Sequence, residues 1–257
     1  MTTDVSTYIG DELELFSHAH NWKNYWGNHV KPYLGERVLE VGAGLGGTTQ
    51  HLLDEKTMKR WTCLEPDPEL ARGIQDKKDK GLLPDTCEIL VKTLADMGIA
   101  GNISDNAQQG RTDSPNTEGP YDAIIYIDVI EHIEDDKAEL AQTLPFLKEN
   151  GHLIILVPAH QFLFSPFDKA IGHFRRYNRP HLKSVVPEGY EIVKTVYLDA
   201  VGLGASLTNK WFLKQSYPTL KQILFWDKYI VSLSKWVDKL TFHNFGKSVL
   251  LVARKKG

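Results

Sequence analysis

The sequence predicts an α/β fold with a mostly parallel sheet that is covered by helices on both faces. Strand-like apolar runs alternate along the chain with helical patterns, as in sheets built from crossover units. The central runs are apolar at nearly every position, which is typical of strands that are buried on both faces. The first run also ends in a glycine-rich loop and continues as a helix, which is the pattern of a strand, a tight turn and a helix.

Seven strands are expected, and they account for most of the apolar runs. In chain order they cover 37–42, 60–65, 88–91, 121–128, 151–158, 190–197 and 247–254. The last two follow one another with helical sequence between them. They therefore predict an antiparallel edge on an otherwise parallel sheet.

Helices are expected between and after these strands. One begins at Thr48 after the glycine-rich loop, and Pro66 to Pro68 open another over 69–78. A helical stretch extends to Leu147, and a long helical segment covers 203–240. The segment 98–120 is rich in Gly, Asn, Ser, Gln and Asp and has no apolar period, so it predicts a peripheral loop.

The composition is that of an ordinary globular domain and excludes several classes of protein. The chain has 257 residues, 42% of them hydrophobic, and a net charge of -3. A fibrous protein, a disordered protein or a protein that binds mainly to nucleic-acid phosphates is therefore not expected. Its two cysteines provide no disulfide framework or thiolate cluster. The acidic N-terminus lacks the pattern of a signal peptide, and no apolar run reaches the length of about 18 residues of a membrane span. We therefore expect one cytoplasmic domain with no nucleic-acid partner and no integral membrane segment.

The glycine loop indicates a nucleoside-containing cofactor but does not name it. Gly42, Gly44 and Gly47 fit G-x-G-x-x-G, the pattern of dinucleotide-binding loops. Glu65 ends the second strand about 20 residues later, where an acid can accept hydrogen bonds from two ribose hydroxyls. Glu40, two residues before the first glycine, would repel a pyrophosphate but suits a cofactor with an amino group and a sulfonium.

The block from Glu40 to Gly46 resembles the E/D-x-G-x-G-x-G motif of class I S-adenosylmethionine-dependent methyltransferases. Blocks at 64–67, 121–132 and 147–158 resemble the same family in the same order, so the resemblance covers about residues 36–160. It implies a Rossmann-like sheet of seven strands, mostly parallel, and S-adenosyl-L-methionine as the cofactor.

The resemblance also implies which residues hold that cofactor. The glycines would pass beneath its methionine part, Glu65 would bind its ribose and Leu94 would cover its adenine ring. The match after the third strand is loose, since the family often has an acid there and this chain has 92–96 with Asp96 as the weaker candidate. The implied set is Glu40, Gly42, Gly44, Gly46, Glu65, Pro66, Leu94, Asp128 and Val129.

Methyl transfer requires an aligned nucleophile, exclusion of water and, for a protonated nucleophile, a proton acceptor. His132 is the first candidate, because neutral imidazole accepts protons near pH 7, and Asp128 and His173 are the other candidate catalytic residues. Alternatively, Glu131 and His132 stabilise the next helix. Asp128, Glu131 and His132 also resemble a metal-binding E-x-x-E-H cluster of ubiquinone-pathway O-methyltransferases, but we predict no metal, because similar strings occur in methyltransferases that need none.

The segment 158–177 follows the fifth strand and carries many polar side chains. Two interpretations are open: these residues orient an anionic or polyhydroxylated acceptor, or they form a buried network with Arg176 paired to Asp168. The residues concerned are His160, Asp168, His173, Arg175, Arg176 and Tyr177.

The predicted organisation is a single domain with three parts. Residues 1–35 form an N-terminal helical lid, 36–160 the cofactor-binding core, and 161–257 the substrate-side loop, cap helices and last strands. The predicted function is methyl transfer to an oxygen or nitrogen of a small-molecule or lipid-linked acceptor, by a protein that could form a homodimer. The alternatives are an NAD(P)-dependent oxidoreductase and a non-catalytic cofactor-binding partner subunit.

Overall fold

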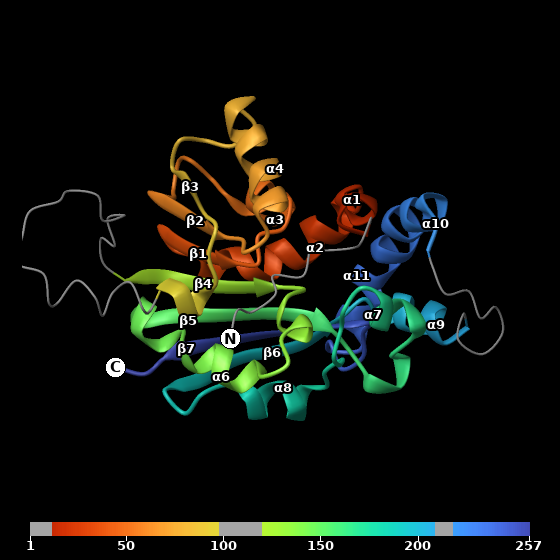
Figure 1. Ribbon diagram of the computed structural model, residues 1–257. Coiled ribbons are helices and arrows are strands. Elements are labelled where there is room, and N and C mark those ends of the chain that lie inside the picture. The colour runs from red at the N-terminus through yellow and green to blue at the C-terminus, as the bar shows by residue number, and fades with distance from the viewer. Residues whose placement is uncertain (1–11, 98–119, 209–217) are drawn as a thin grey trace, which may run out of the picture.

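Seven strands form one sheet with helices on both faces, as the sequence predicts (Figure 1). The structure is a computed structural model that describes residues 12–97, 120–208 and 218–257. The predicted loop at 98–120 therefore lies almost entirely outside the described residues.

The strands are β1 (Arg37–Val41), β2 (Arg60–Leu64), β3 (Cys87–Leu90), β4 (Tyr121–Ile127), β5 (Leu147–Pro158), β6 (Tyr190–Leu198) and β7 (Ser248–Lys255). The α-helices are α1 (Glu12–Ser17), α2 (His20–Val30), α3 (Gly47–Leu52), α4 (Pro68–Asp79), α6 (Asp136–Ala141), α7 (Pro166–Ala170), α8 (Arg179–Val185), α9 (Ala200–Thr208), α10 (Leu220–Phe225) and α11 (Val231–Leu240). A 3-10 turn covers Ile130–His132, and a π-helical turn, Trp226–Ile230, joins α10 to α11.

The strand order is β3-β2-β1-β4-β5-β7-β6, and only β7 runs against its neighbours. The predicted antiparallel edge is present, because β6 and β7 pair in opposite directions at one edge of the sheet. The edge strand β6 is antiparallel only to β7, and β7 is inserted between β6 and β5. The strand order cannot be derived from the order along the chain, because it depends on which neighbour each late strand pairs with.

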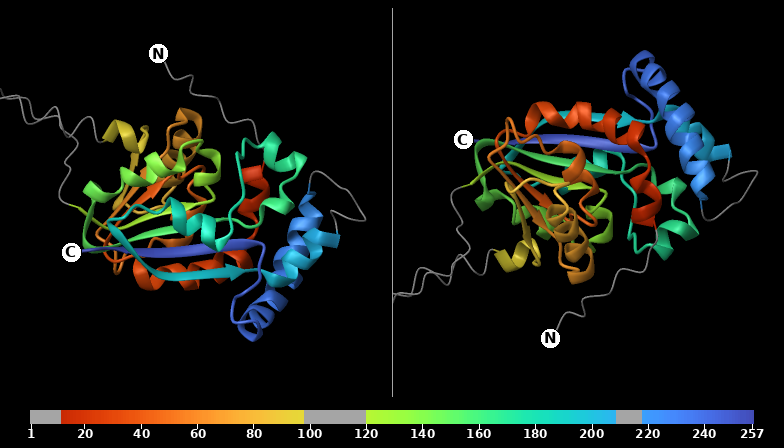
Figure 2. Two further views of the ribbon diagram at one scale, coloured as in Figure 1. Left: turned by 90° about the horizontal axis from the view of Figure 1, so that it is seen from below. Right: turned by 90° about the horizontal axis from the view of Figure 1, so that it is seen from above.

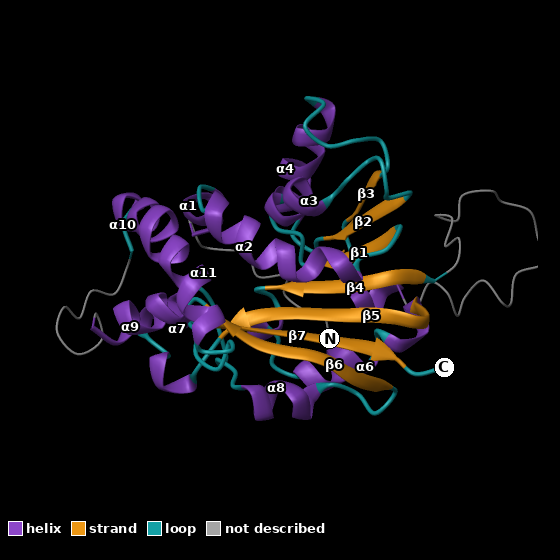
Figure 3. Ribbon diagram, turned by 180° about the vertical axis from the view of Figure 1, so that it is seen from behind, coloured by secondary structure: helices purple, strands orange, loops and turns teal. Residues whose placement is uncertain are grey.

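Helices cover both faces of the sheet (Figure 3), and an apolar layer of side chains holds them in place on each face. Alternate residues of each strand point to opposite faces, so Val38 and Ile125 pack with α2, α3 and α4, whereas Leu39 and Ile124 pack with α6 and α8. The central strands are buried on both faces, which explains why their sequences show no alternation of polar and apolar residues.

Two helical predictions were too long. The stretch after β4 consists of two 3-10 turns with the short helix α6 between them, and β5 begins at Leu147, where the helix was expected to end. The segment 203–240 is not one helix, because Pro218 and Thr219 precede α10 outside any helix and Thr219 caps its N-terminus. Prolines and a capping residue mark such a boundary, although the apolar pattern continues across it.

The carboxyl ends of β1, β4 and β5 and the beginning of β7 meet at one end of the sheet. The helices α1, α7, α9, α10 and α11 gather around that end, far from the C-terminus (Figure 2). Ligands of open α/β sheets bind at this edge. Among the described residues, no helix combines the length and the apolar character that crossing a membrane requires.

Candidate active site

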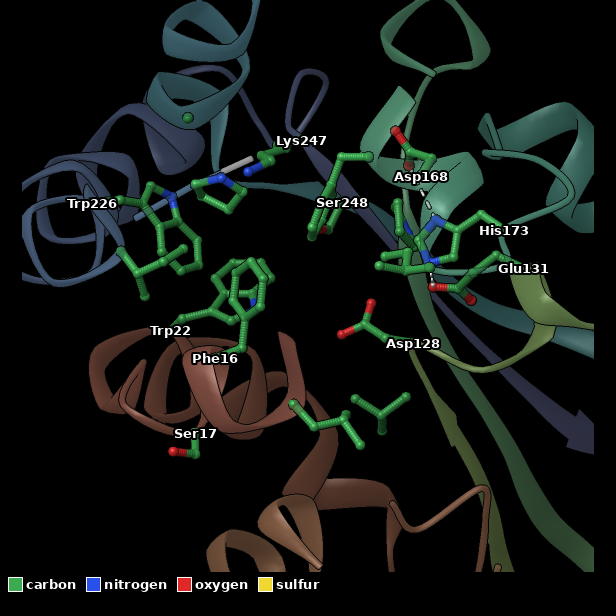
Figure 4. Close-up of a pocket in the computed structure, with 18 of the residues that line it drawn as sticks. Phe16, Ser17, Trp22, Asp128, Glu131, Asp168, His173, Trp226, Lys247 and Ser248 are labelled. Atoms are coloured by element: carbon green, nitrogen blue, oxygen red, sulfur yellow. Dashed lines mark hydrogen bonds and ion pairs between the residues drawn. The ribbon is translucent and has the colours of Figure 1, made fainter. Parts of the chain in front are cut away.

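A cavity of about 1250 Å³ opens at this edge of the sheet (Figure 4). Its wall combines α1, α2, the glycine loop, the ends of β4 and β5, the 3-10 turn after β4, α7, α9, α10 and the beginning of β7. The glycine loop therefore shares one cavity with the acidic and imidazole side chains of the later segments.

The glycine loop turns sharply at the end of β1. Gly42, Gly44 and Gly46 all have positive φ values, of 69°, 56° and 70°, which side-chain-bearing residues rarely adopt. A Cβ atom on Gly42 would also lie 2.8 Å from Val129 Cγ2. The backbone N–H groups of Gly42 and Ala43 both donate to the Leu64 carbonyl, at 2.8 and 3.0 Å, so β2 holds the loop in place.

Glu65 connects the glycine loop to the helix that follows β2. Its carboxylate accepts hydrogen bonds from the N–H groups of Gly44 at 2.7 Å and Asp67 at 3.0 Å. Asp67 in turn caps α4 by accepting from the N–H groups of Glu69 and Leu70. Burial raises the pKa of Glu65 although these two bonds lower it. Pro66 is exposed next to this network.

Glu40 lies beneath the glycine loop and not in the cavity wall. Its Oε2 accepts from Thr49 Oγ1 at 2.6 Å and from Trp61 Nε1 at 2.8 Å. Burial raises the pKa of Glu40 to about 7. The motif predicts that Glu40 lies near the cofactor; in the structure its carboxylate faces α3 and β2 beneath the loop, and these contacts are not visible in the sequence pattern.

The other residues of the implied cofactor set divide into two groups. Gly42, Gly44 and Asp128 line the cavity. Gly46 directly precedes α3 and packs against Ile74, Val129 packs against Gly42, and Leu94 is buried in the apolar layer on the α6 face. The structure thus brings the loop and Asp128 together and places the second group behind the wall.

Asp128 is the first residue after β4 and points into the cavity (Figure 4). It has a φ of 54°, and its N–H donates to the Leu156 carbonyl at 2.8 Å, which fixes the turn. Among the described residues no donor binds its carboxylate. Asp128 is exposed to the cavity, but the surrounding protein partly desolvates its carboxylate and raises its pKa to about 6, and the positive charges of His173, Lys247 and Arg176 lower it only in part.

His173 belongs to a network around Asp168. The Asp168 carboxylate is 3.0 Å from His173 Nδ1 and accepts from Arg176 Nε at 2.7 Å and Nη2 at 3.0 Å. Ser165 adds a capping box at the beginning of α7. These hydrogen bonds hold the pKa of Asp168 well below its usual range although burial opposes them. The Arg176–Asp168 pair that the sequence analysis gave as one interpretation is present, in the wall of the cavity.

Three residues of that segment turn away from the cavity wall. Arg175 Nη1 and the Tyr177 hydroxyl both donate to Asp136, at 2.8 and 2.7 Å, which ties the segment to α6. The His160 ring stacks on Phe162 and Tyr197. These residues stabilise the fold of the segment.

Glu131 and His132 lie beside His173 in the cavity wall. Neither carboxylate oxygen of the fully buried Glu131 has a hydrogen-bond partner among the described residues, and burial raises its pKa well above the usual range. Burial lowers the pKa of His132 to about 4, while a hydrogen bond to the Ile171 carbonyl opposes this shift. Ligand atoms of Glu131, His132 and His173 lie within 4.8 Å of one another, so these residues could hold a metal ion. The set differs from the predicted alternative, which contained Asp128 in place of His173.

The cavity also contains residues that sequence reasoning missed. Lys247 reaches it from the beginning of β7, with its Nζ 5.3 Å from the centre of the Trp226 ring, and burial lowers the pKa of its amine. Lys23 and Lys77 line the side next to the glycine loop, and the Nζ of Lys77 donates to the Leu45 carbonyl at 2.6 Å. In the sequence, Lys247 could be recognised as the residue directly before the last strand. Its place at this edge of the sheet depends on the pairing of β7 with β5, which the sequence does not show.

The N-terminal aromatic residues join the cavity to the later helices. Trp22 and Phe16 line it and make ring contacts with Trp226, with centroids 5.7 and 6.2 Å apart. Asp227 fixes this arrangement by accepting from the backbone N–H groups of Asn21 and Trp22, at 3.1 and 2.8 Å.

The sheet order and the cavity at the glycine loop define the class of protein as a Rossmann-like α/β protein with a ligand site at the carboxyl ends of its strands. A family model described as "Methyltransferase domain" matches residues 5–193, and the chain belongs to that family. It is an S-adenosylmethionine-dependent methyltransferase with S-adenosyl-L-methionine as its cofactor, which confirms the predicted fold, class and cofactor. The alternative of an NAD(P)-dependent oxidoreductase is not retained. The comparison with curated protein sequences finds no match.

Solved structures share the fold at low sequence identity. A protein of Galdieria sulphuraria, provisionally assigned as a sarcosine dimethylglycine methyltransferase, is 16% identical with a TM-score of 0.56, over 92% of this chain and 85% of that one. A chain of the complex between the Haloferax volcanii Trm112 methyltransferase activator and a provisionally assigned methyltransferase is 14% identical with a TM-score of 0.58, over 96% of both chains. Magnesium protoporphyrin IX methyltransferase from Synechocystis, with bound S-adenosylmethionine, is 13% identical with a TM-score of 0.50, over 96% of this chain and 82% of that one.

Proposed function

We propose that this methyltransferase transfers its methyl group to an oxygen, or a nitrogen, of a small-molecule or lipid-linked acceptor. The observation that carries the proposal is the single cavity that joins the glycine loop to Asp128 and His173. Cofactor and acceptor would therefore meet above the end of β4, with the acceptor on the side of α7, α9 and α10.

The residues next to the glycine loop fit S-adenosylmethionine, which carries a carboxylate, an ammonium and a sulfonium. Gly42 and Gly44 offer a side-chain-free surface, and Glu65 lies at the end of β2 to bind the ribose hydroxyls. The amine of Lys23 lies beside Gly47 in the same wall and suits the cofactor carboxylate. Bound there, S-adenosylmethionine supplies a methyl group on a positively charged sulfur.

Asp128 is the proton acceptor that the geometry supports best. With a pKa of about 6 it is ionised at pH 7, it points into the cavity, and no described donor occupies its carboxylate. His132 was the first candidate from the sequence, but its pKa of about 4 makes it a weak base. His173, whose Nδ1 is held by Asp168, keeps Nε2 on the side of Glu131 and completes the polar wall behind the acceptor.

The acceptor side is mainly aromatic and apolar, and the partly buried amine of Lys247 lies on it. Phe16, Trp22 and Trp226 form an apolar wall, and Lys247 stands across from Asp128 (Figure 4). Such a wall suits a flat or lipid-like acceptor whose hydroxyl reaches Asp128 and whose anionic group reaches Lys247. A hydroxyl acceptor is favoured over an amine, because a hydroxyl must give up its proton to a base such as Asp128, whereas a neutral amine can attack the methyl group without one.

The proposal predicts that Asp128→Asn lowers kcat strongly and changes the affinity for S-adenosylmethionine little. A screen of phenols, hydroxy acids and polyprenyl-linked hydroxyls with methyl-labelled cofactor would first find the acceptor. In the wild type kcat should then rise with pH through about 6 and level off above it, because Asp128 must be ionised. The acidic limb should disappear in Asp128→Asn.

Glu139→Gln is the matched control, since Glu139 is a partly buried carboxylate bonded to Tyr126 outside the cavity wall. Full kcat in Asp128→Asn would remove Asp128 from the mechanism. Activity in the presence of excess EDTA is expected to be unchanged, and its loss with recovery by Mg²⁺ would assign Glu131, His132 and His173 to a metal instead.

A further inference from the structure

The helices α10 and α11, with the turn that follows at 241–245, expose a large apolar surface, which we call the α10–α11 face. Nine of the fifteen exposed large apolar side chains in the described part of the chain lie on it, and Trp236 and Leu240 are 72% and 78% exposed. The nine are Leu220, Leu224, Phe225, Tyr229, Leu233, Trp236, Leu240, Phe242 and Phe245. Monomeric soluble proteins rarely leave such a contiguous surface in water without a partner.

The spacing of these residues keeps them on one side of the helix. Leu220, Leu224, Tyr229, Leu233, Trp236 and Leu240 follow one another at steps of four, five, four, three and four residues. The step of five crosses the π-helical turn Trp226–Ile230, whose wider winding absorbs the additional residue. The opposite side, with Ile223, Val231 and Ser234, is buried against the body of the protein.

The charges that accompany this surface are all positive. Lys221, Lys228 and Lys239 are exposed on the same helices, and Lys235 is half-buried over the Tyr25 ring. The two acids of these helices, Asp227 and Asp238, are buried and accept hydrogen bonds from the protein interior.

This cationic surface belongs to a chain with a net charge of -3, so the charge is distributed unevenly. Asp199, Asp227 and Asp238 are the only acids after Glu191, and all three are buried. A second copy of the chain would bring lysines against lysines across a two-fold axis, which disfavours a dimer through this face.

We propose that the α10–α11 face is a docking surface for an anionic lipid bilayer. Aromatic and leucine side chains on one side of a helix, flanked by lysines, are what an interfacial helix needs to enter the headgroup region. Phe225 and Lys221 belong to this face and also line the active-site cavity, so docking would bring the cavity mouth to the membrane. The helices stand at the end of the molecule, where a flat surface can reach them (Figure 2).

Vesicle co-sedimentation of the full chain tests this proposal without any methyl transfer, so its outcome is independent of the proposed acceptor. The vesicles are phosphatidylcholine alone, and phosphatidylcholine with about 30% phosphatidylglycerol. We expect binding to the anionic vesicles that is at least tenfold stronger than to the neutral ones and that weakens with salt. We expect the double variants Trp236→Ser/Leu240→Ser and Lys228→Glu/Lys239→Glu each to bind the anionic vesicles about tenfold or more weakly than the wild type.

Matched controls lie elsewhere on the surface. Leu82→Ser/Val91→Ser replaces two exposed apolar residues, and Lys56→Glu/Lys80→Glu reverses two exposed lysines, so both should bind vesicles as the wild type does. Circular dichroism and thermal unfolding verify that every variant is folded.

The proposal is overturned if the wild type does not bind anionic vesicles, or if the α10–α11 variants bind like their controls. It is also overturned if light scattering shows a wild-type dimer that Trp236→Ser/Leu240→Ser dissociates while vesicle binding is unchanged. In that case a second copy covers the face.

Discussion

At the scale of single residues, Glu65 holds the glycine loop and is also proposed to bind the cofactor ribose, and the sequence motif does not separate these two tasks. Its position at the end of β2 suits the ribose hydroxyls, and its carboxylate also holds the N–H of Gly44 and therefore the shape of the glycine loop. The motif predicted the first task and gave no sign of the second. Glu40 shows the same limit: its spacing from the glycines was clear, but its hydrogen bonds to Thr49 and Trp61 depend on tertiary packing.

Glu65→Ala is expected to weaken the binding of S-adenosylmethionine by about 1.5–3 kcal/mol, the scale of hydrogen bonds to a charged group. Glu65→Gln should lose less, because its amide oxygen can still accept from Gly44. Isothermal titration calorimetry of both variants measures the effect. If Glu65→Ala binds with wild-type affinity, neither the ribose role nor the loop-holding role stands.

At the scale of elements, buried aspartates connect the C-terminal helices to the body of the protein. Asp238 of α11 accepts from the Tyr25 hydroxyl of α2 at 2.7 Å and from the N–H groups of Asp199 and Ala200, both at 2.8 Å. The sequence predicted the existence of most strands and helices, since their periodicity is local. It could not predict which acids are buried, because the partners of Asp238 lie up to 213 residues away.

Tyr25→Phe should therefore destabilise the protein by about 1.5–3 kcal/mol, since the hydroxyl donates to a buried carboxylate. Tyr229→Phe is the control, because the Tyr229 ring is exposed and its loss of a hydroxyl should change stability by less than about 0.5 kcal/mol. Urea denaturation of the two variants and the wild type provides the comparison. Equal stability of Tyr25→Phe and Tyr229→Phe would contradict the anchoring role of Asp238.

At the scale of the whole molecule, burial of carboxyl groups around the site makes stability depend on pH. The pKa of Glu40 is about 7 in the folded protein, above its usual value of 4.5. The contribution of protonated Glu40 to the free energy of unfolding is therefore fully present below pH 4.5, and it is lost as the pH rises through about 7. The fold could be predicted, because the apolar strand runs and the motif agree. The pH dependence of stability could not be predicted, because the sequence does not show whether an acid between two apolar neighbours is buried.

Glu40→Gln removes this titration. In the absence of cofactor, the unfolding free energy of the variant relative to the wild type should rise by about 2 kcal/mol between pH 5 and pH 8, by the size of the pKa shift. Urea denaturation at both pH values measures it, with Glu55→Gln as the control at an exposed acid. A difference that does not change with pH would mean that Glu40 is not buried as the structure shows.

The central claim is that the cavity at the glycine loop binds S-adenosylmethionine, and calorimetric titration with this cofactor, S-adenosylhomocysteine and NADH tests it most directly. Asp128 in the wall disfavours a pyrophosphate, and Gly42 and Gly44 offer the surface for a methionine part. We expect micromolar binding of the first two ligands and none of NADH. Binding of NADH alone would contradict this claim and would favour an NAD(P)-dependent oxidoreductase instead.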